Sequence, residues 1–155
     1  MKTDFALLTA CNEGLAPPTF RFYGWDQPTL SVGYSRARGE TIDLNRCRQQ
    51  QVPIVRRPTG GRILLHHNEL TYSIVAPNDH PGFSQGLQRT NQIISQSLAD
   101  CLNQLDLKGA ALVYSKPNSK QQDRLKTKTC FGLSNRFEVT VDGKKIMGSA
   151  QRRLS

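Results

Sequence analysis

The sequence predicts an α+β fold in which helices flank a mixed, largely antiparallel sheet. Three observations predict it. Short stretches that alternate apolar and polar residues, typical of half-buried strands, recur along the 155-residue chain. The last two of them meet at an Asp-Gly pair, residues 142–143, which is typical of a tight antiparallel hairpin. Between the strands lie stretches whose apolar residues recur near every 3.6 positions, as in helices with one buried face.

The first half of the chain contains two predicted helices and five predicted strands. Residues 3–13 have apolar side chains at helical spacing and end before a glycine. Residues 40–50 form the second predicted helix, with Ile42, Leu44 and Cys47 as its candidate buried positions. The strands predicted in this half are 18–25, 29–34, 52–57, 61–66 and 70–76.

The second half opens with the longest predicted helix, residues 84–105, which Ser84 can cap. The apolar residues that give it a helical period are Leu87, Ile94, Leu98, Cys101, Leu102 and Leu105. A strand at 111–114 follows, and the Asp-Gly turn joins a strand at 135–141 to one at 144–151. Because the chain has no internal repeat and no linker, we expect one domain around one sheet.

Composition excludes several classes of protein. Hydrophobic residues make up 37% of the chain and charged residues 21%, as in globular proteins and unlike disordered ones. No apolar run is long enough to cross a bilayer, and the N-terminus lacks the features of a signal peptide. We therefore expect a cytoplasmic protein with no membrane partner. The four cysteines include no CxxC pair, and we expect no metal site.

The chain is strongly basic, with 21 Lys and Arg against 12 Asp and Glu and a formal charge of +9. Such a charge favours an acidic partner, which can be a nucleic acid, an anionic lipid or an acidic protein. The basic residues concentrate in 115–129, which is either a solvated loop or a binding surface. That stretch has no interleaved aromatics and the chain has no RNA-binding motif, so nucleic acid is the least favoured partner.

The stretch RRPTGGRILLHH, residues 56–67, places paired positive charge beside a glycine turn. Gly60 and Gly61 permit positive φ and allow backbone amides to approach a ligand, and successive amides in such a turn bind anions. Arg56 and Arg57 face opposite sides of a strand, so only one can enter a given cleft. The pattern indicates an anionic or carbonyl-bearing ligand over the turn, although a glycine pair also occurs in purely structural hairpins.

Two histidines end the same stretch. In a strand His66 and His67 point to opposite faces, so they do not form a chelating pair. His66 can act as a general base or can hydrogen-bond the turn and hold its shape. We favour the supporting role.

Four stretches together resemble one superfamily, that of the lipoate-protein ligases, octanoyltransferases and biotin-protein ligases. Residues 56–66 resemble its RRxTGGGxxxH signature, and residues 141–153, VDGKKIMGSAQRR, resemble its G-[RK]-K-[ILV]-x-G-S-A-[QY] motif. Residues 130–139, CFGLSNRFEV, are similar to the CF…E-V segment of the LipM-type octanoyltransferases, and residues 17–34 to the strand pair before the signature. The stretches occur in the family's order over nearly the entire chain.

The resemblance implies the fold of the biotin/lipoate protein ligase catalytic domain. Residues 1–155 would form a partial domain, truncated at both ends, because the family's domain has a further strand before the first helix and continues past the second motif. Two positions depart from the family pattern: Arg62 stands in place of a third glycine, and His67 in place of an acidic or polar residue.

The resemblance also implies which residues act. Lys145 would point into the acyl pocket and bind the acyl carbonyl, where an ammonium stabilises developing negative charge. Cys130 would attack an octanoyl thioester and pass the acyl group to a lysine of a lipoyl domain, and a nearby ammonium would lower the pKa of its thiol. The implied substrate-binding residues are Arg57, Thr59, Gly60, Gly61, His66, Gly148, Ser149 and Ala150.

Three functions stay open at this point. The first is octanoyl transfer from acyl carrier protein to a lipoyl domain, which needs no cofactor; Cys130 and Gln151, where ligases often carry Tyr, favour it. The second is an ATP-dependent lipoate-protein ligase, which needs ATP and Mg and takes a lipoyl group. The third is an inactive remnant or a basic binding module. Acyl carrier protein and lipoyl domains are both acidic, which suits the +9 charge.

Overall fold

A computed structural model describes residues 1–34, 42–107, 109–114 and 137–154. The described residues form two compact units, one of Met1–His80 with Arg152–Ser155 and one of Pro81–Gln151. The predicted α+β class with largely antiparallel pairing is confirmed. Where the sequence predicts one sheet, backbone hydrogen bonds join the described strands into three sheets.

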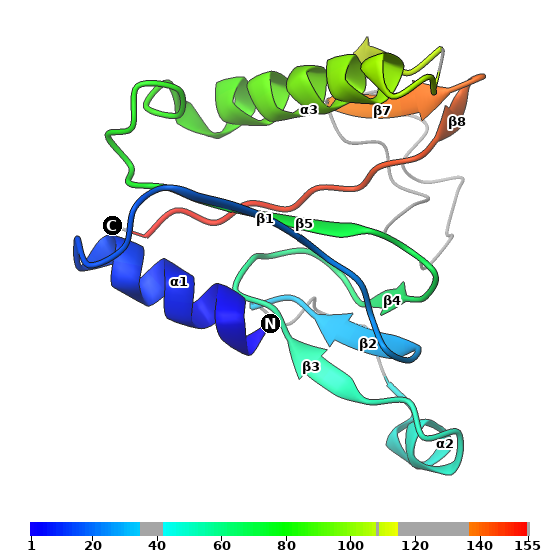
Figure 1. Ribbon diagram of the computed structural model, residues 1–155. Helices are drawn as coiled ribbons and strands as arrows, with labels where there is room; N and C mark the ends of the chain where they lie inside the picture. The colour runs from blue at the N-terminus through cyan, green and yellow to red at the C-terminus, as the bar shows by residue number, and fades with distance from the viewer. Residues whose placement is uncertain (35–41, 108, 115–136, 155) are drawn as a thin grey trace, which may run out of the picture. The chain divides into compact units, whose positions relative to one another are not determined.

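In the first unit, helix α1 (Lys2–Asn12) packs against a two-stranded antiparallel sheet of β1 (Thr19–Tyr23) and β5 (Thr71–Val75) (Figure 1). The alternation of β1 gives the sheet two different faces. Arg21 and Tyr23 contact Asp4 of the helix, whereas Phe20 and Phe22 are each about half exposed.

The second sheet of this unit has the order β3-β2-β4. Strand β2 (Thr29–Val32) pairs parallel with β3 (Ile54–Arg56) and antiparallel with β4 (Leu64–His66). All five strands predicted in the first half are therefore present, each shorter than predicted. The segment that joins β3 to β4 contains the glycine pair.

Helix α2 (Leu44–Gln49) is shorter than the predicted helix over 40–50. It begins after Asp43, whose side chain accepts a hydrogen bond from the Arg46 N–H. The prediction that Leu44 is buried is wrong, since 53% of Leu44 is exposed. None of the six residues in this helix is buried, so its apolar spacing does not correspond to a packed face.

In the second unit, helix α3 (Gly86–Gln104) packs on β6 (Ala111–Tyr114) and β7 (Phe137–Val141), which pair antiparallel (Figure 1). The predicted Asp-Gly turn is confirmed, with φ of 49° at Asp142 and 72° at Gly143. It leads into β8 (Lys144–Lys145), which pairs over two residues instead of the predicted 144–151.

Helix α3 confirms the strongest helical prediction but not its details. Ser84 is not its cap, because the cap position is Gln85 and no side chain makes a capping bond there. Leu87 and Leu105 are 51% and 72% exposed, although their spacing suggested burial. The buried positions are instead small residues, Thr90, Ser95 and Ala99. Small side chains let a helix approach a sheet closely, and a pattern of large apolar residues does not reveal them.

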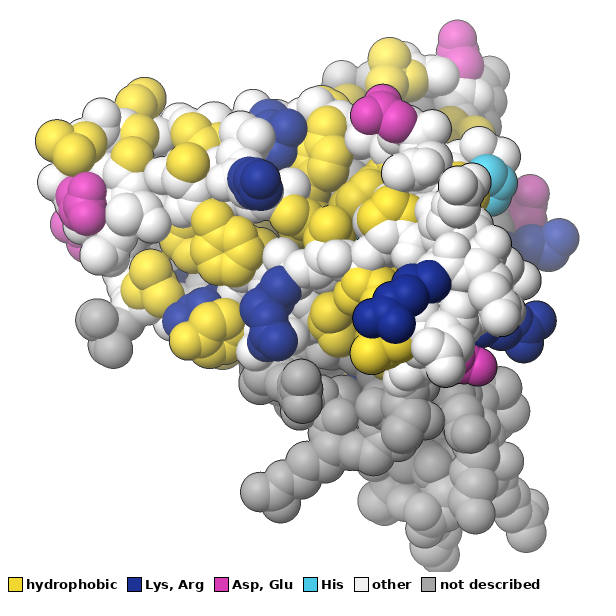
Figure 2. Space-filling model, turned by 90° about the horizontal axis from the view of Figure 1, so that it is seen from below, with side chains coloured by type: hydrophobic (Ala, Val, Ile, Leu, Met, Phe, Trp, Pro, Cys, Tyr) yellow, Lys and Arg dark blue, Asp and Glu magenta, His cyan; other side chains and the backbone are white. Residues whose placement is uncertain are grey.

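Large hydrophobic side chains also remain on the surface. Figure 2 shows hydrophobic side chains lying between Lys and Arg side chains on one face. On the β1–β5 sheet, the ring of Phe20 lies 4.7 Å from that of Phe22 and 6.4 Å from that of Tyr72, measured between centroids. Among the described helices, none has the length and apolarity needed to span a bilayer.

Candidate functional site

The glycine turn, residues 58–62, lies between β3 and β4 and is tied to the end of β2. The Tyr34 N–H donates to the Thr59 carbonyl at 2.8 Å. Gly61 has φ of +96°, which favours glycine. Gly33 allows the close approach of the two segments, because a Cβ there would overlap the carbonyl oxygen of Gly61. Gly60, in contrast, is not among the glycines with positive φ.

Arg57 is 7% exposed, and its guanidinium lies inside the turn. Nε and Nη2 donate to the Gly60 carbonyl at 3.2 and 3.1 Å, and Nη2 also donates to the Arg62 carbonyl. Nη1 donates to the carbonyl and the hydroxyl oxygen of Ser31 at 3.1 and 2.7 Å. A guanidinium has five N–H groups, and these contacts occupy that number. Arg57 therefore shapes the turn from within.

Two other arginines border the turn. Arg56 is exposed, as the alternation of the strand requires, and donates to the Tyr34 carbonyl at 3.0 Å. The guanidinium carbon of Arg152 lies 3.5 Å from the centroid of the Tyr34 ring, within the range of a cation–π contact. The prediction that one arginine of the Arg56–Arg57 pair binds a ligand stays a prediction.

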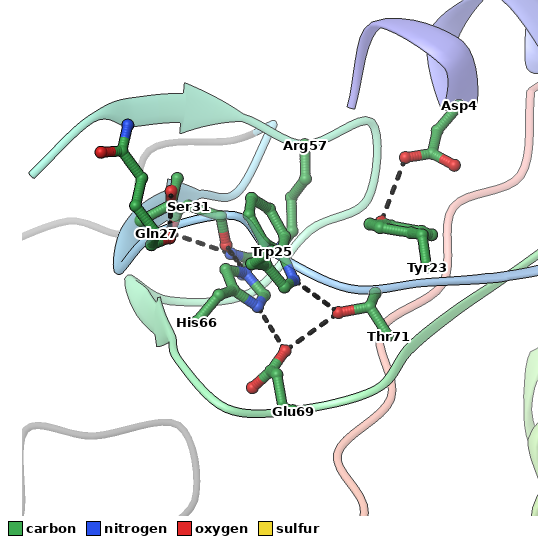
Figure 3. A network of polar contacts seen from close by, with 10 residues as sticks. Asp4, Tyr23, Trp25, Gln27, Ser31, Arg57, His66, Glu69 and Thr71 are labelled. Carbon is green, nitrogen blue, oxygen red and sulfur yellow. Dashed lines mark hydrogen bonds and ion pairs between the residues drawn. The ribbon is translucent and has the colours of Figure 1, made fainter.

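His66 is 4% exposed and shares the hydroxyl oxygen of Ser31 with Arg57 (Figure 3). Its Nε2 lies 2.7 Å from Ser31 Oγ, and its Nδ1 lies 2.6 Å from Glu69 Oε1. The indole of Trp25 stacks on the imidazole, with centroids 4.1 Å apart and planes 14° apart. His67 points the other way and is exposed.

A second branch reaches the same carboxylate. The Trp25 indole N–H donates to Thr71 Oγ1 at 2.7 Å, and Thr71 Oγ1 donates to Glu69 Oε1 at 3.0 Å. Figure 3 shows both branches converging on Glu69. His66, Trp25 and Arg57 are thus fixed by one network, and the supporting role of His66 stays a prediction.

Asp4 and Tyr23 form a neighbouring polar cluster, also drawn in Figure 3. Burial alone would raise the pKa of Asp4, but hydrogen bonds from Arg21 and Ser73 and the charge and hydrogen bond of the N-terminal amine together outweigh it, and the pKa is lowered. The pKa of Tyr23 is raised, first by burial and then by the charge of Asp4, which accepts a hydrogen bond from the Tyr23 hydroxyl at 3.2 Å. This cluster ties α1 to β1.

The second motif belongs to the other unit. Lys145 lies opposite Thr140 in the β7–β8 pair, and its Nζ donates to Glu138 Oε1 at 2.9 Å. The side chains of Lys145 and Glu138 are 13% and 14% exposed. Lys144 is exposed, as expected for the opposite face.

The remaining residues of that motif lie after the last strand. Gly148 and Ala150 are exposed and Ser149 is half-buried. Cys130 lies outside the described residues, so its position relative to Lys145 is not described. The predicted roles of Cys130, Lys145 and the substrate-binding residues stay predictions.

The network contains residues that the sequence did not single out, above all Ser31, Glu69 and Trp25. Ser31 sits in an ordinary strand pattern, and its partners are 26 and 35 positions away in the chain. Only the pairing of β2 with β3 and β4 brings them together. In the described part of the chain, no three or more His, Cys, Asp or Glu side chains are grouped so that they could hold a metal ion.

Comparison with known families gives one match over the whole chain. The sequence profile of the lipoyl protein ligase A/B catalytic domain matches residues 1–155. Among curated proteins, the chain is similar to octanoyltransferase LipM of Kyrpidia tusciae, with 38% identity over 99% of this chain and 56% of that protein. It is also similar to octanoyltransferase LipM of Geobacillus kaustophilus, with 40% identity over 99% of this chain and 55% of that protein. The chain spans little more than half the length of these relatives.

Solved structures show the same fold at lower identity. A crystal structure of lipoate-protein ligase A bound with ATP matches 97% of this chain and 54% of that chain, with a TM-score of 0.70 and 22% identity. The bipartite lipoate protein ligase of Thermoplasma acidophilum matches 98% of this chain and 52% of that chain, with a TM-score of 0.57 and 23% identity.

Proposed function

Because the chain belongs to the lipoyl protein ligase A/B catalytic-domain family, we propose that it transfers an octanoyl group from acyl carrier protein to a lysine of a lipoyl domain. The observation that carries this proposal is the 38–40% identity to LipM octanoyltransferases over 99% of the chain. The sequence adds a cysteine ahead of the lysine motif, at position 130, which a thioester mechanism requires.

The proposed reaction has two steps. In the first, the Cys130 thiol gives up its proton and its sulfur attacks the thioester carbonyl of octanoyl-acyl carrier protein; a new C–S bond forms, the C–S bond to the carrier breaks, and the carrier leaves as a thiol with the proton that Cys130 gave up. In the second, the amine of a lipoyl-domain lysine attacks the acyl-enzyme, an amide forms, and the Cys130 thiol is restored. No cofactor is consumed.

Lys145 is proposed to stabilise the oxyanion of both steps. Its Nζ is held by Glu138 at 2.9 Å and can donate to an acyl oxygen as negative charge develops there. The low exposure of both side chains limits screening by water, so the charge of Lys145 would act on a nearby acyl oxygen more strongly than in open solvent.

The glycine turn is proposed to bind the acyl donor. Arg57 holds the turn in shape, and Thr59, Gly60 and Gly61 provide backbone groups that a carbonyl or an anion can approach. The small residues Gly148, Ser149 and Ala150 would leave room for a thin acyl chain. The acidic surfaces of acyl carrier protein and of the lipoyl domain would meet a chain with a formal charge of +9.

The test is capture of the acyl group, followed by intact mass after incubation with octanoyl-acyl carrier protein. We expect one octanoyl adduct on the wild-type chain, none on Cys130→Ser, and an unchanged adduct on Cys101→Ser, a control at an exposed cysteine of α3. Lys145→Ala should slow capture, whereas Lys144→Ala at the neighbouring exposed position should not. An adduct that survives in Cys130→Ser would exclude Cys130 as the nucleophile.

A lipoate-protein ligase is the second candidate, because the chain has the fold of a ligase that was crystallised with ATP. A ligase would modify a lipoyl domain when given ATP, Mg and free lipoate, without an acyl carrier. If the chain does this and gives no product from octanoyl-acyl carrier protein, the ligase function replaces the transferase.

A further inference from the structure

The network around His66 has ends whose hydrogen-bonding roles are fixed by chemistry. The guanidinium of Arg57 and the indole N–H of Trp25 can only donate, and the carboxylate of Glu69 can only accept. Between these ends lie two hydroxyl groups and one imidazole, whose protons can be placed in more than one way. The contacts therefore determine the direction of each bond in between (Figure 3).

One branch starts at Arg57. Its Nη1 donates to Ser31 Oγ at 2.7 Å, so this oxygen is an acceptor in that bond. Ser31 Oγ also lies 2.7 Å from His66 Nε2 and can donate its own proton there when Nε2 is unprotonated. Because the carboxylate of Glu69 can only accept, Nδ1 carries a proton and donates it to Glu69 at 2.6 Å, and in a neutral imidazole Nε2 is then the acceptor of the Ser31 proton.

The other branch holds the ring from the side. Trp25 stacks on His66 and is itself fixed by its bond to Thr71, which donates to the same oxygen of Glu69. Both branches thus end on one carboxylate oxygen. The plane of the imidazole and its tautomer are both set by residues other than His66.

The Ser–His–Glu arrangement does not form a hydrolytic triad. A nucleophilic serine must reach substrate, but Ser31 is fully buried, with 0% of its surface exposed. Its oxygen also accepts a bond from Arg57, which lowers its reactivity toward a carbonyl. What the arrangement can do is hold Arg57.

Arg57 in turn fixes a peptide unit of the turn. It holds the Gly60 carbonyl through Nε and Nη2. No peptide bond among the described residues is cis, and in a trans peptide the N–H points opposite to the C=O. The Gly61 N–H, which shares the peptide unit with the Gly60 carbonyl, therefore points away from the guanidinium.

We propose that Ser31, His66 and Glu69 form a positioning relay that locks His66 in the Nδ1–H tautomer and, through Arg57, presents the Gly61 N–H to the acyl donor. The last part of this inference rests on the proposed function. Ser31 and Glu69 are positioning residues, since they act through Arg57 and His66 and do not touch the substrate.

The tautomer is tested without any activity. Long-range ¹H–¹⁵N correlation spectra of the labelled chain at about pH 8.5, above the ordinary range of an imidazole pKa, distinguish the two nitrogens of each of the three histidines. The signal absent in His66→Gln identifies His66, and the exposed His67 is the control. We expect a protonated Nδ1 and an unprotonated Nε2 at His66, and a change at Nε2 in Ser31→Ala. An Nε2–H tautomer at His66 would overturn the relay.

The link to substrate is tested by steady-state kinetics of octanoyl transfer. Because the turn contacts the donor in the ground state and in the transition state alike, Ser31→Ala should raise KM about tenfold with kcat within about twofold. Ser97→Ala, at an exposed serine of α3, should leave both unchanged. An unchanged KM in Ser31→Ala, or a fall in kcat alone, would refute the role of the relay in binding.

The two measurements separate the relay from the proposed function. If the wild-type chain captures no octanoyl group, the proposed function fails, while the spectrum still decides whether the relay exists. If Ser31→Ala does not fold, the spectrum of the wild-type chain decides in the same way. If capture occurs but His66 has the other tautomer, the relay fails and the proposed function stands.

Discussion

At the scale of single residues, the glycine turn depends on Gly33 and Gly61 more than on Gly60. The signature pair Gly60–Gly61 attracts notice in the sequence, yet only Gly61 has positive φ. A Cβ on Gly61 would also come within 2.9 Å of Arg57 Nη2. Gly33 directly follows β2, and its importance arises only from the contact with the turn.

This difference gives a prediction about stability. A Cβ on Gly33 would overlap the Gly61 carbonyl oxygen and come 3.0 Å from the Gly60 carbonyl carbon, so backbone must move. We expect Gly33→Ala to lower the free energy of unfolding by about 1–3 kcal/mol, the usual cost of overpacking. The measurement is the urea concentration at which half of the protein is unfolded, compared between variants whose free energy of unfolding has the same slope against urea concentration.

Gly60→Ala is the matched control, because a Cβ there meets nothing within 4 Å. Its free energy of unfolding should change by less than about 0.5 kcal/mol. Equal midpoints for Gly33→Ala and the wild-type chain would show that the turn does not pack against β2 as described.

The paired arginines show how far residue-level sequence reasoning reaches. Alternation along a strand predicts that Arg56 and Arg57 face opposite sides, and the structure confirms this. Alternation cannot tell which of them is buried, or that the buried one bonds to backbone carbonyls. That depends on Ser31 and on the path of the turn, which are set by tertiary structure.

At the scale of elements, helix α1 is tied to β1 by a buried carboxylate. Asp4 is 4% exposed and accepts a bond from Arg21 at 2.7 Å. Its pKa is lowered from the ordinary value of 3.8, because the effect of burial is outweighed by the bonds from Arg21 and Ser73 together with the charge and hydrogen bond of the N-terminal amine. A lowered pKa in the folded state means that the unfolded chain takes up a proton first as the pH falls.

The resulting prediction concerns the stability of the folded chain at acidic pH. The stability that Asp4 contributes should be fully present above about pH 5, and it should disappear as the pH falls below 3.8 and through the lowered pKa. We expect Asp4→Asn to cost about 1.5–3 kcal/mol near pH 6, the usual value of hydrogen bonds to a charged group, and progressively less toward pH 3. Urea unfolding across this range measures the difference between the variant and the wild-type chain.

Tyr23→Phe serves as the control for the acid effect. This substitution removes one hydrogen bond to Asp4 but leaves the carboxylate bonded to Arg21. The variant should therefore lose stability with falling pH in the same way as the wild-type chain. A difference between Asp4→Asn and the wild-type chain that grows toward low pH would contradict the direction of the pKa shift.

Local sequence patterns predicted most of the helices and strands. They did not predict which residues are buried, or where an element ends, when those features depend on tertiary packing. The Asp-Gly hairpin was predictable because the turn needs positive φ at both central residues, which this pair accepts. The buried face of α3 was not predictable, because Thr90, Ser95 and Ala99 are small or polar. Their burial depends on the sheet against which the helix packs. The end of β8 at Lys145 was not predictable either, since the apolar and small residues that follow fit a strand equally well.

At the scale of the whole molecule, the formal charge of +9 is the property most relevant to the proposed partners. Figure 2 shows Lys and Arg side chains between exposed hydrophobic ones on one face of the described residues. Such a surface would attract an acidic protein at long range and offer apolar contacts at short range. The net charge follows from the sequence alone, but the distribution of these side chains over the surface requires the fold.

This charge leads to a prediction about rates. The Debye length falls from about 10 Å at 0.1 M salt to about 3 Å at 1 M, so attraction between the two proteins should be screened. We expect the second-order rate constant for octanoyl capture from acidic acyl carrier protein to fall about tenfold or more between about 0.05 and 0.5 M salt. Stopped reactions analysed by intact mass give this rate constant directly.

A neutral octanoyl thioester of N-acetylcysteamine provides the comparison, because it delivers the same acyl group without the charged carrier. Its rate constant should change by less than about twofold over the same range, since there is no long-range attraction to screen. Equal salt dependence for both donors would mean that salt acts on the chemistry or the fold and not on the encounter. The basic surface would then have no part in recognising the carrier, whatever the outcome for Cys130 and Lys145.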